Sequence, residues 1–115
     1  MTIRFTRDAD ADIVEILRYT RDEFGLSQAA TYKQIMQRAF DMIESDPMRV
    51  GSRLLEQFGP QIRQLHLGSA AGRRNRAAHI VIYHVGEKTQ RGLTITVIRI
   101  LHDRMDPDLH LVEMP

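Results

Sequence analysis

The segment Leu93–Leu101 constrains the fold of this chain most, because it reads as an extended strand that is apolar on both faces. Successive side chains of a strand point to opposite faces of the sheet. A strand covered on both sides belongs in the middle of a sheet, and an arginine inside it needs a partner. For Arg99 we keep two interpretations open, a structural ion pair or carbonyl cap and a functional role. The two predicted faces are Leu93, Ile95, Val97, Arg99 and Leu101, and Thr94, Thr96, Ile98, Ile100 and His102.

The length of the chain, 115 residues, suits one hydrophobic core, so we expect a single domain over residues 1–115. A hydrophobic content of 43% and a charged content of 27% are typical of a soluble globular protein. We expect no membrane-spanning helix, because every apolar run is far shorter than the roughly 18 residues required. The first residues lack the apolar core of a signal peptide, which predicts a cytoplasmic protein. Without cysteine, the chain has no disulfide, thiolate chemistry or cysteine-based zinc site.

Charge is distributed unevenly along the sequence. Residues 1–48 carry six Arg or Lys and nine Asp or Glu, residues 49–104 carry ten and three, and residues 105–115 carry none and three. A basic middle segment between acidic flanks fits contact with nucleic acid, or with an acidic protein that covers the basic surface. Charge alone does not choose between these partners.

The first half of the chain is predicted to form a short strand and two helices. Thr2–Phe5 alternates polar and apolar residues, and Thr6 is a suitable N-cap for a helix over residues 7–24. We expect Gly25 to end this helix in the left-handed conformation and Ser27 to cap a second helix over residues 28–45. So short a connection predicts an antiparallel helical hairpin.

The second half changes to extended periodicity. Three segments rich in β-branched and aromatic residues are separated by glycine-containing loops, Gly68–Arg76 and Gly86–Gly92, and a short strand is possible at Arg53–Glu56. The predicted fold is α+β, with the helical hairpin packed on one face of a three-stranded antiparallel meander. The three strands are Ile62–Leu67, Ala77–Val85 and Leu93–Leu101.

Individual residues add a family resemblance to this order of elements. The positions that carry it are Phe5, Thr6, Ala9, Asp12, Ile13, Ile16, Tyr19, Phe24, Gly25, Ala30, Tyr32, Pro47, Gly51, Gly59, Arg63, Ile82, Tyr83, Arg99, Ile100, Leu101, His102 and Asp106. Through these positions the chain resembles the ParE branch of the ParE/RelE toxin family over nearly its whole length, and the segment Arg99–Asp106 is the most specific part of the match. Two features depart from the pattern: the enlarged basic loop Gly68–Arg76, and His79, where the family often has an aromatic residue.

The resemblance implies the toxin of a type II toxin–antitoxin system, which arrests growth and contributes to plasmid or chromosomal stability. It implies DNA gyrase as the target, and neutralisation by a cognate antitoxin with a ribbon-helix-helix or similar DNA-binding half and a disordered tail. Operator DNA would be reached only through the antitoxin. The resemblance implies no cofactor and no catalytic residue.

Two alternatives stay open. RelE-branch toxins cut messenger RNA in the ribosome, and a metal-independent ribonuclease needs a base, an acid and cations on the phosphate, for which Arg63, Tyr83, Arg99 and His102 are the candidates. Strand Ile62–Leu67 has only Arg63, however, and Ala77–Val85 has no Lys or Arg, which favours the gyrase branch. A non-toxic antitoxin-binding co-repressor is the third hypothesis.

Candidate contacts to the target or antitoxin are mainly arginines. For His102 we favour a role in fixing the turn before Asp103 by hydrogen bonding over contact with the target. We predict no metal site, because His79 and His84 point to opposite faces of their strand. Tyr19 and Tyr32 are expected to pack in the core or hairpin. The binding candidates are Arg63, Arg73, Arg74, Arg76, Arg99, His102 and Arg104.

Overall fold

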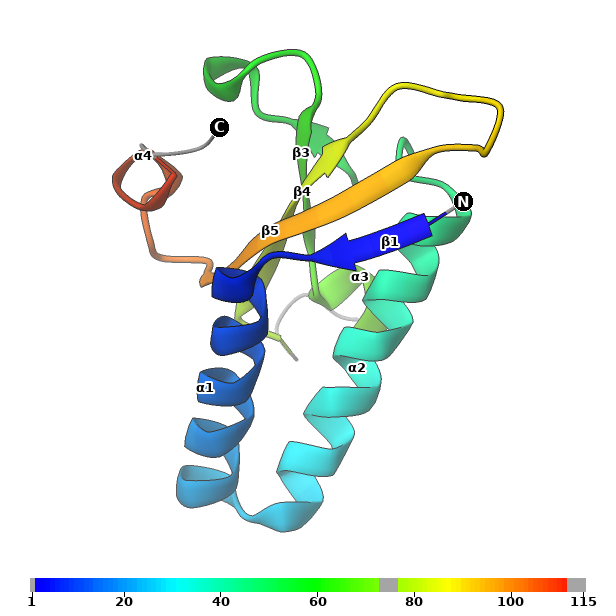
Figure 1. Cartoon of the computed structure of the whole chain (residues 1–115). Helices are drawn as coiled ribbons and strands as arrows, with labels where there is room; N and C mark the ends of the chain where they lie inside the picture. Colours follow the sequence, from blue (N-terminus) through cyan, green and yellow to red (C-terminus); the bar gives the residue numbers. More distant parts are fainter. Residues whose placement is uncertain (1, 73–76, 112–115) are drawn as a thin grey trace.

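A computed structural model describes residues 2–72 and 77–111. Within these residues a helical hairpin packs on one face of a five-stranded mixed sheet, in the strand order β1-β5-β4-β3-β2 (Figure 1). The predicted α+β fold is confirmed. The elements are β1 Thr2–Phe5, α1 Arg7–Phe24, α2 Leu26–Ser45, β2 Arg53–Leu54, a 3-10 turn Glu56–Phe58, β3 Ile62–His66, α3 Gly68–Ala71, β4 His79–Val85, β5 Thr94–His102 and α4 Pro107–His110.

The start of the hairpin follows its predicted capping. The Thr6 hydroxyl accepts the Ala9 backbone N–H at 3.0 Å and donates to the Ile98 carbonyl oxygen at 2.7 Å, so it caps α1 and ties it to β5. Acidic Asp8 and Asp10 lie in the first turn, where the helix dipole favours negative charge.

The turn between the helices differs from the prediction. Gly25 ends α1 with φ 95° and ψ 170°, which is positive in φ but extended rather than left-handed helical. Ser27 is not a cap, because α2 already begins at Leu26 and the Ala29 N–H bonds to the Gly25 carbonyl oxygen at 3.1 Å. Glycine alone adopts this backbone conformation readily, so one residue reverses the chain.

The predicted meander is confirmed as the antiparallel strands β3, β4 and β5, with the whole sheet extended by one short strand at each edge. On one side β1 pairs in parallel with β5, from Thr2 opposite Thr94 to Phe5 opposite Val97. On the other side β2 pairs with β3 and is only two residues long, shorter than the predicted Arg53–Glu56.

A β-bulge in β5 corrects the predicted faces of that strand. Tyr83 pairs with Val97 and Ile82 with Arg99, so Ile98 is an extra residue that shifts the register. Strict alternation therefore fails: Val97 and Ile100 share the core beneath the helices, whereas Leu101 belongs to the core on the opposite face. The five odd-numbered positions of this segment do not form one row.

Both faces of the sheet are nevertheless covered, as predicted. The helix-side core contains Met36, Phe40, Leu65, Val81 and Tyr83 among others. The opposite core is smaller and is formed by Leu55, Ile62, Ile80, Ile82, Leu101 and Leu111. No helix in the described part of the chain is long and apolar enough to cross a membrane.

The loop after β3 begins with α3, which was not predicted. Arg73, Arg74 and Arg76, predicted as binding residues in this loop, lie outside the described residues.

Candidate functional site

The predicted partner requirement of Arg99 is met by Asp12 on α1. Arg99 Nε donates to Asp12 Oδ2 at 2.8 Å and Arg99 Nη2 donates to Asp12 Oδ1 at 3.0 Å, a bidentate pair. Asp12 Oδ2 also accepts the Ile100 backbone N–H at 2.9 Å. Hydrogen bonding to the Asp12 carboxylate raises the pKa of Arg99, which favours its charged form. Of the two interpretations of Arg99, the structural ion pair therefore has its partner, which is Asp12 on α1.

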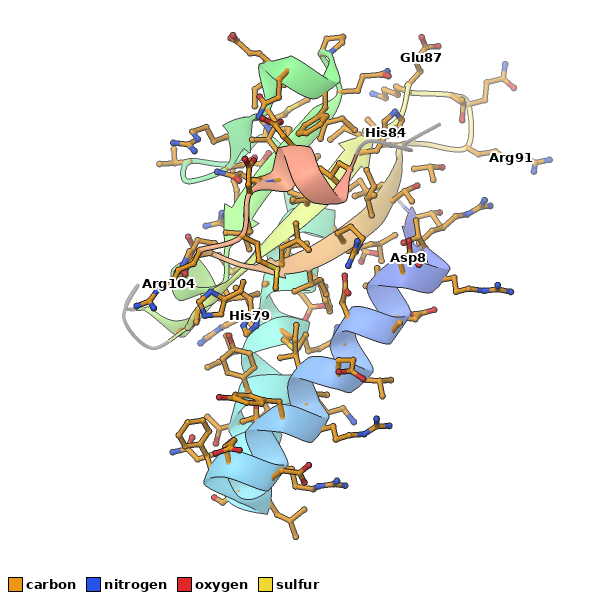
Figure 2. The ribbon with its side chains drawn as sticks, turned by 90° about the vertical axis from the view of Figure 1, so that its left-hand side faces the viewer. Asp8, His79, His84, Glu87, Arg91 and Arg104 are labelled. Carbon is orange, nitrogen blue, oxygen red and sulfur yellow. The ribbon has the colours of Figure 1, made fainter. Side chains whose placement is uncertain are left out.

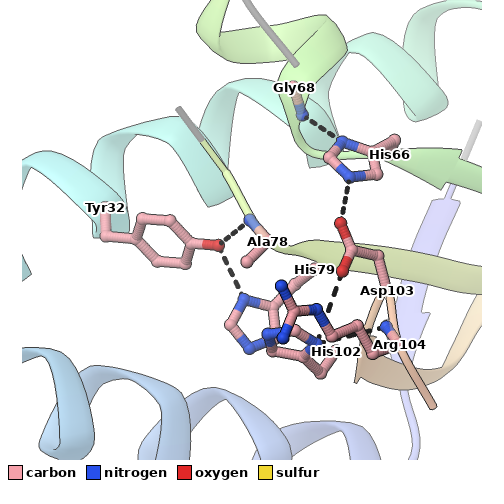
Figure 3. A network of polar contacts seen from close by, with 8 residues as sticks. All are labelled: Tyr32, His66, Gly68, Ala78, His79, His102, Asp103 and Arg104. Atoms are coloured by element: carbon pink, nitrogen blue, oxygen red, sulfur yellow. Dashed lines mark hydrogen bonds and ion pairs between the residues drawn. The ribbon is translucent and has the colours of Figure 1, made fainter. Parts of the chain in front are cut away.

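Next to this pair, Tyr32 on α2 meets His79 on β4. The Tyr32 hydroxyl oxygen accepts the Ala78 backbone N–H at 3.2 Å and lies 2.6 Å from His79 Nδ1 (Figure 3). Burial lowers the pKa of His79 to about 4, with the neighbouring His102 as the second cause. Burial likewise raises the pKa of Tyr32. At neutral pH both side chains are therefore uncharged.

His79 pairs across the sheet with His102, the last residue of β5. Their ring centroids lie 5.4 Å apart in an edge-to-face arrangement. His102 Nδ1 accepts the Arg104 backbone N–H at 3.1 Å, which confirms the predicted turn-fixing role of His102.

A buried histidine on β3 completes this polar network. His66 Nδ1 accepts the Gly68 backbone N–H at 2.9 Å, and His66 Nε2 lies 3.0 Å from Asp103 Oδ2. This hydrogen bond lowers the pKa of Asp103. The network thus connects α2, β4, the turn after β5 and β3 (Figure 3).

The network forms part of a groove of about 860 Å³ between the helical hairpin and the ends of β4 and β5. Tyr19 and Phe24 contribute exposed aromatic rings, 61% and 66% exposed, with centroids 6.4 Å apart. Tyr19 is therefore not the packed residue that the sequence predicted. The lining residues are Asp12, Glu15, Ile16, Tyr19, Thr20, Phe24, Gln28, Tyr32, Ala77, Ala78, His79, Arg99, Ile100, Leu101, His102 and Met105.

The four ribonuclease candidates form two separate groups. Arg63 Nε donates to Ser52 Oγ at 2.7 Å, and the buried Tyr83 hydroxyl donates to the Pro47 carbonyl oxygen at 2.6 Å while contacting Ser52 Oγ at 2.6 Å. Tyr83 lies four residues from His79 along β4, a separation of roughly 13 Å at the rise of a strand. His79 is the cross-strand partner of His102. Arg63 and Tyr83 therefore do not face one phosphate together with His102.

Arg104, another predicted contact residue, is exposed in the turn after β5. His84, which was considered only as a metal ligand, lies on β4 and bonds to Gln61 at 3.1 Å. Figure 2 shows His79 and His84 near opposite ends of β4. Among the residues with described positions, no group of three His, Cys, Asp or Glu side chains could hold a metal ion.

Sequence reasoning missed Asp12, Tyr32 and His66 as members of this site. Asp12 was matched only as a family position. The available signal was an arginine inside an apolar strand, which required a partner, but nothing in the sequence pointed to residue 12 as its source.

Comparisons with known proteins agree with this architecture. The structure is similar to a solved chain described as the chromosomal ParDE toxin–antitoxin system from P. aeruginosa, with a TM-score of 0.67 and 22% identity over 89% of this chain and 95% of that one. This likeness defines the class of fold.

Sequence similarity defines the family. Residues 3–107 match the model of the ParE toxin of type II toxin–antitoxin systems. Toxin ParE1 of two Mycobacterium tuberculosis strains is 37% identical over 90% of both chains, and Toxin ParE1 of Caulobacter vibrioides is 30% identical over 94% of this chain and 95% of the other. The chain belongs to the ParE toxin family of type II toxin–antitoxin systems.

Proposed function

We propose that this ParE-family toxin inhibits DNA gyrase and is neutralised by a cognate antitoxin whose tail fills the groove between the hairpin and the sheet. The observation that carries the neutralisation step is the groove itself, about 860 Å³ in volume and edged by the exposed rings of Tyr19 and Phe24. Exposed apolar surface of this kind is a common feature of binding sites.

The groove favours a tail that carries apolar side chains together with acidic ones. Tyr19, Phe24 and Met105 supply apolar surface, and exposed Arg104 follows the end of β5. A disordered tail would fold as it binds, so the antitoxin stabilises the complex by mass action. A ribbon-helix-helix half of the antitoxin would then bring the pair to operator DNA.

A non-enzymatic mechanism is supported by the internal hydrogen bonds of the ribonuclease candidates. Ser52 and Pro47 engage Arg63 and Tyr83 in an internal network, and Arg99 is bonded to Asp12. Strand β4 contributes no Lys or Arg for binding a scissile phosphate.

Induced expression in a sensitive host tests the target. Gyrase inhibition predicts growth arrest with DNA breaks and a damage response while messenger RNA stays intact. Rapid cleavage of ribosome-bound messages before any DNA damage would support the ribonuclease mechanism instead. Normal growth with a fully folded protein would favour the co-repressor role.

Coexpression tests neutralisation. The product of the adjacent reading frame should restore growth, and the purified complex should melt at a higher temperature than the free toxin. The complex should weaken as salt is added, because basic and acidic surfaces meet. An adjacent product that neither restores growth nor raises the melting temperature would contradict this part of the proposal.

A further inference from the structure

Three histidines of the network share one feature, which is that a hydrogen-bond donor occupies Nδ1 of each ring. The donors are the Gly68 N–H at His66, the Arg104 N–H at His102 and the Tyr32 hydroxyl at His79. Of the two contacts of the Tyr32 hydroxyl, the Ala78 N–H is a donor, so among the described residues His79 Nδ1 is the acceptor that the structure offers for the Tyr32 proton. A neutral imidazole whose Nδ1 accepts a hydrogen bond carries its proton on Nε2.

Each of these rings therefore presents an Nε2–H donor. His66 uses its donor on Asp103 at 3.0 Å. Among the described residues, Nε2 of His79 and Nε2 of His102 have no hydrogen-bond partner, and both rings line the groove. Protonation of either ring would leave Nε2–H in place, so this donor pair persists in both charge states.

We propose that His79 and His102 form a carboxylate-binding subsite in the groove, which takes an Asp or Glu side chain from the antitoxin tail. The two rings are cross-strand neighbours, with centroids 5.4 Å apart, and both line the same groove. This inference rests on the proposed neutralisation and specifies the chemistry that the tail must supply.

Of the three neighbouring carboxylates, Asp12 is paired with Arg99 and exposed Glu15 lies 3.7 Å from Arg18. Asp103 keeps its negative charge and is bonded to His66. Asp103 Oδ1 approaches His102 on its Nδ1 edge, at 3.4 Å, which leaves the Nε2 edge for the ligand. Tyr32 adds no charge, because burial raises the pKa of its hydroxyl.

Nitrogen NMR on 15N-histidine-labelled toxin tests the donor pair directly. We expect His66, His79 and His102 to show the Nε2–H tautomer, and acetate to shift the Nε2 signals of His79 and His102 but not that of His84. If inorganic phosphate moves these signals and acetate does not, the ligand is a phosphate and the carboxylate assignment is wrong. An Nδ1–H tautomer at His79 or His102 would also overturn the proposal.

Binding to the adjacent antitoxin tests the partner. His102→Phe keeps a ring but removes both nitrogens, and should raise the Kd about 10-fold or more. His102→Gln also lacks the Nδ1 acceptor of the Arg104 N–H, but it places an amide N–H near the Nε2 position and should recover part of the loss. His84→Phe, on the same sheet but outside the groove, is the matched control. A double-mutant cycle should couple His102 to one acidic tail residue changed to its amide.

The outcomes separate the subsite from the proposed function. If wild-type toxin binds the antitoxin and His102→Phe binds as tightly as His84→Phe, the carboxylate subsite is wrong and neutralisation stands. If wild-type toxin does not bind the antitoxin at all, both proposals fail.

Discussion

Arg99 on β5 and Asp12 on α1, 87 residues apart in the sequence, meet through two hydrogen bonds of 2.8 and 3.0 Å. The pair joins the helical hairpin to the sheet just past the end of β1. It lies directly after the bulge at Ile98, whose carbonyl oxygen accepts the Thr6 hydroxyl proton. The first turns of α1 are thus fastened to the bulged part of β5 at two points.

Removing Arg99 should therefore destabilise the fold. Arg99→Ala leaves a largely buried Asp12 carboxylate without its bidentate partner, so we expect a loss of about 1–3 kcal/mol in the free energy of unfolding. Asp12→Ala should cost more, because the Ile100 N–H also loses its acceptor. Urea denaturation gives both values. The exposed pair of Arg18 and Glu15 is the control, and Arg18→Ala should change stability by less than about 0.5 kcal/mol.

Tyr83→Phe should also reduce stability although it removes only one oxygen atom. The fully buried Tyr83 hydroxyl donates to the Pro47 carbonyl oxygen, and its loss leaves polar groups around Ser52 without that partner. We expect a cost of about 1–3 kcal/mol by urea denaturation. Tyr19→Phe removes an exposed hydroxyl and should be nearly neutral, so equal effects of the two changes would contradict this assignment.

Acidification should destabilise the protein through His79. Its pKa is about 4 in the folded chain against 6.5 as the reference, so the unfolded state binds more protons between these values. Stability is then fully present above pH 6.5 and is lost as the pH falls toward 4, with a slope of at most about 1.4 kcal/mol per pH unit from this one group. Urea titrations at several pH values measure the slope.

His79→Asn provides the comparison for that measurement. Its side-chain oxygen can accept the Tyr32 proton in place of Nδ1, but it does not titrate. The slope between pH 6.5 and 4 should therefore become smaller in this variant. An unchanged slope would assign the pH dependence to other groups.

The aromatic residues of the groove should affect the antitoxin more than the fold. Phe24→Ala and Tyr19→Ala remove exposed rings, and we expect each to weaken antitoxin binding about 10-fold with little change in melting temperature. Val50→Ala, at a 98% exposed position outside the groove, is the matched control for calorimetric titration. If all three variants bind the antitoxin with equal affinity, the antitoxin binds outside this groove.

Charge removal should separate toxicity from stability. Arg104 is exposed, and its hydrogen bond to His102 is made by its backbone N–H, so Arg104→Gln should relieve growth inhibition without lowering the melting temperature. The same change at Arg73, Arg74 and Arg76 extends the test to the basic loop. If all of these variants remain toxic, the basic surface does not bind the target.

Local sequence signals predicted much of this fold. Thr6 and Gly25 predicted the two ends of α1. The three central strands were predicted from their β-branched residues, because the periodicity of a strand is a local property of the sequence. The bulge at Ile98 was not predictable, since one extra residue in a strand leaves the composition unchanged. The prediction that Ser27 caps α2 was wrong, because Gly25 alone makes the turn and α2 begins at Leu26.

The site was less predictable than the fold, because its members come from distant segments. An arginine at position 99, within an apolar strand, indicated that a partner was required, but the choice of Asp12 depends on how α1 docks beside β5. Likewise, Tyr32 meets His79 only through the packing of α2 on β4. The sequence contains both residues without any local pattern that connects them.

Incubation of purified toxin with DNA gyrase and a circular plasmid tests the central claim most directly. Inhibition should accumulate gyrase-linked cleaved DNA as the toxin concentration rises, and prior addition of the adjacent antitoxin should abolish it. Toxin that leaves gyrase supercoiling and cleavage unchanged, while purified ribosomes lose their messenger RNA in its presence, would contradict the account.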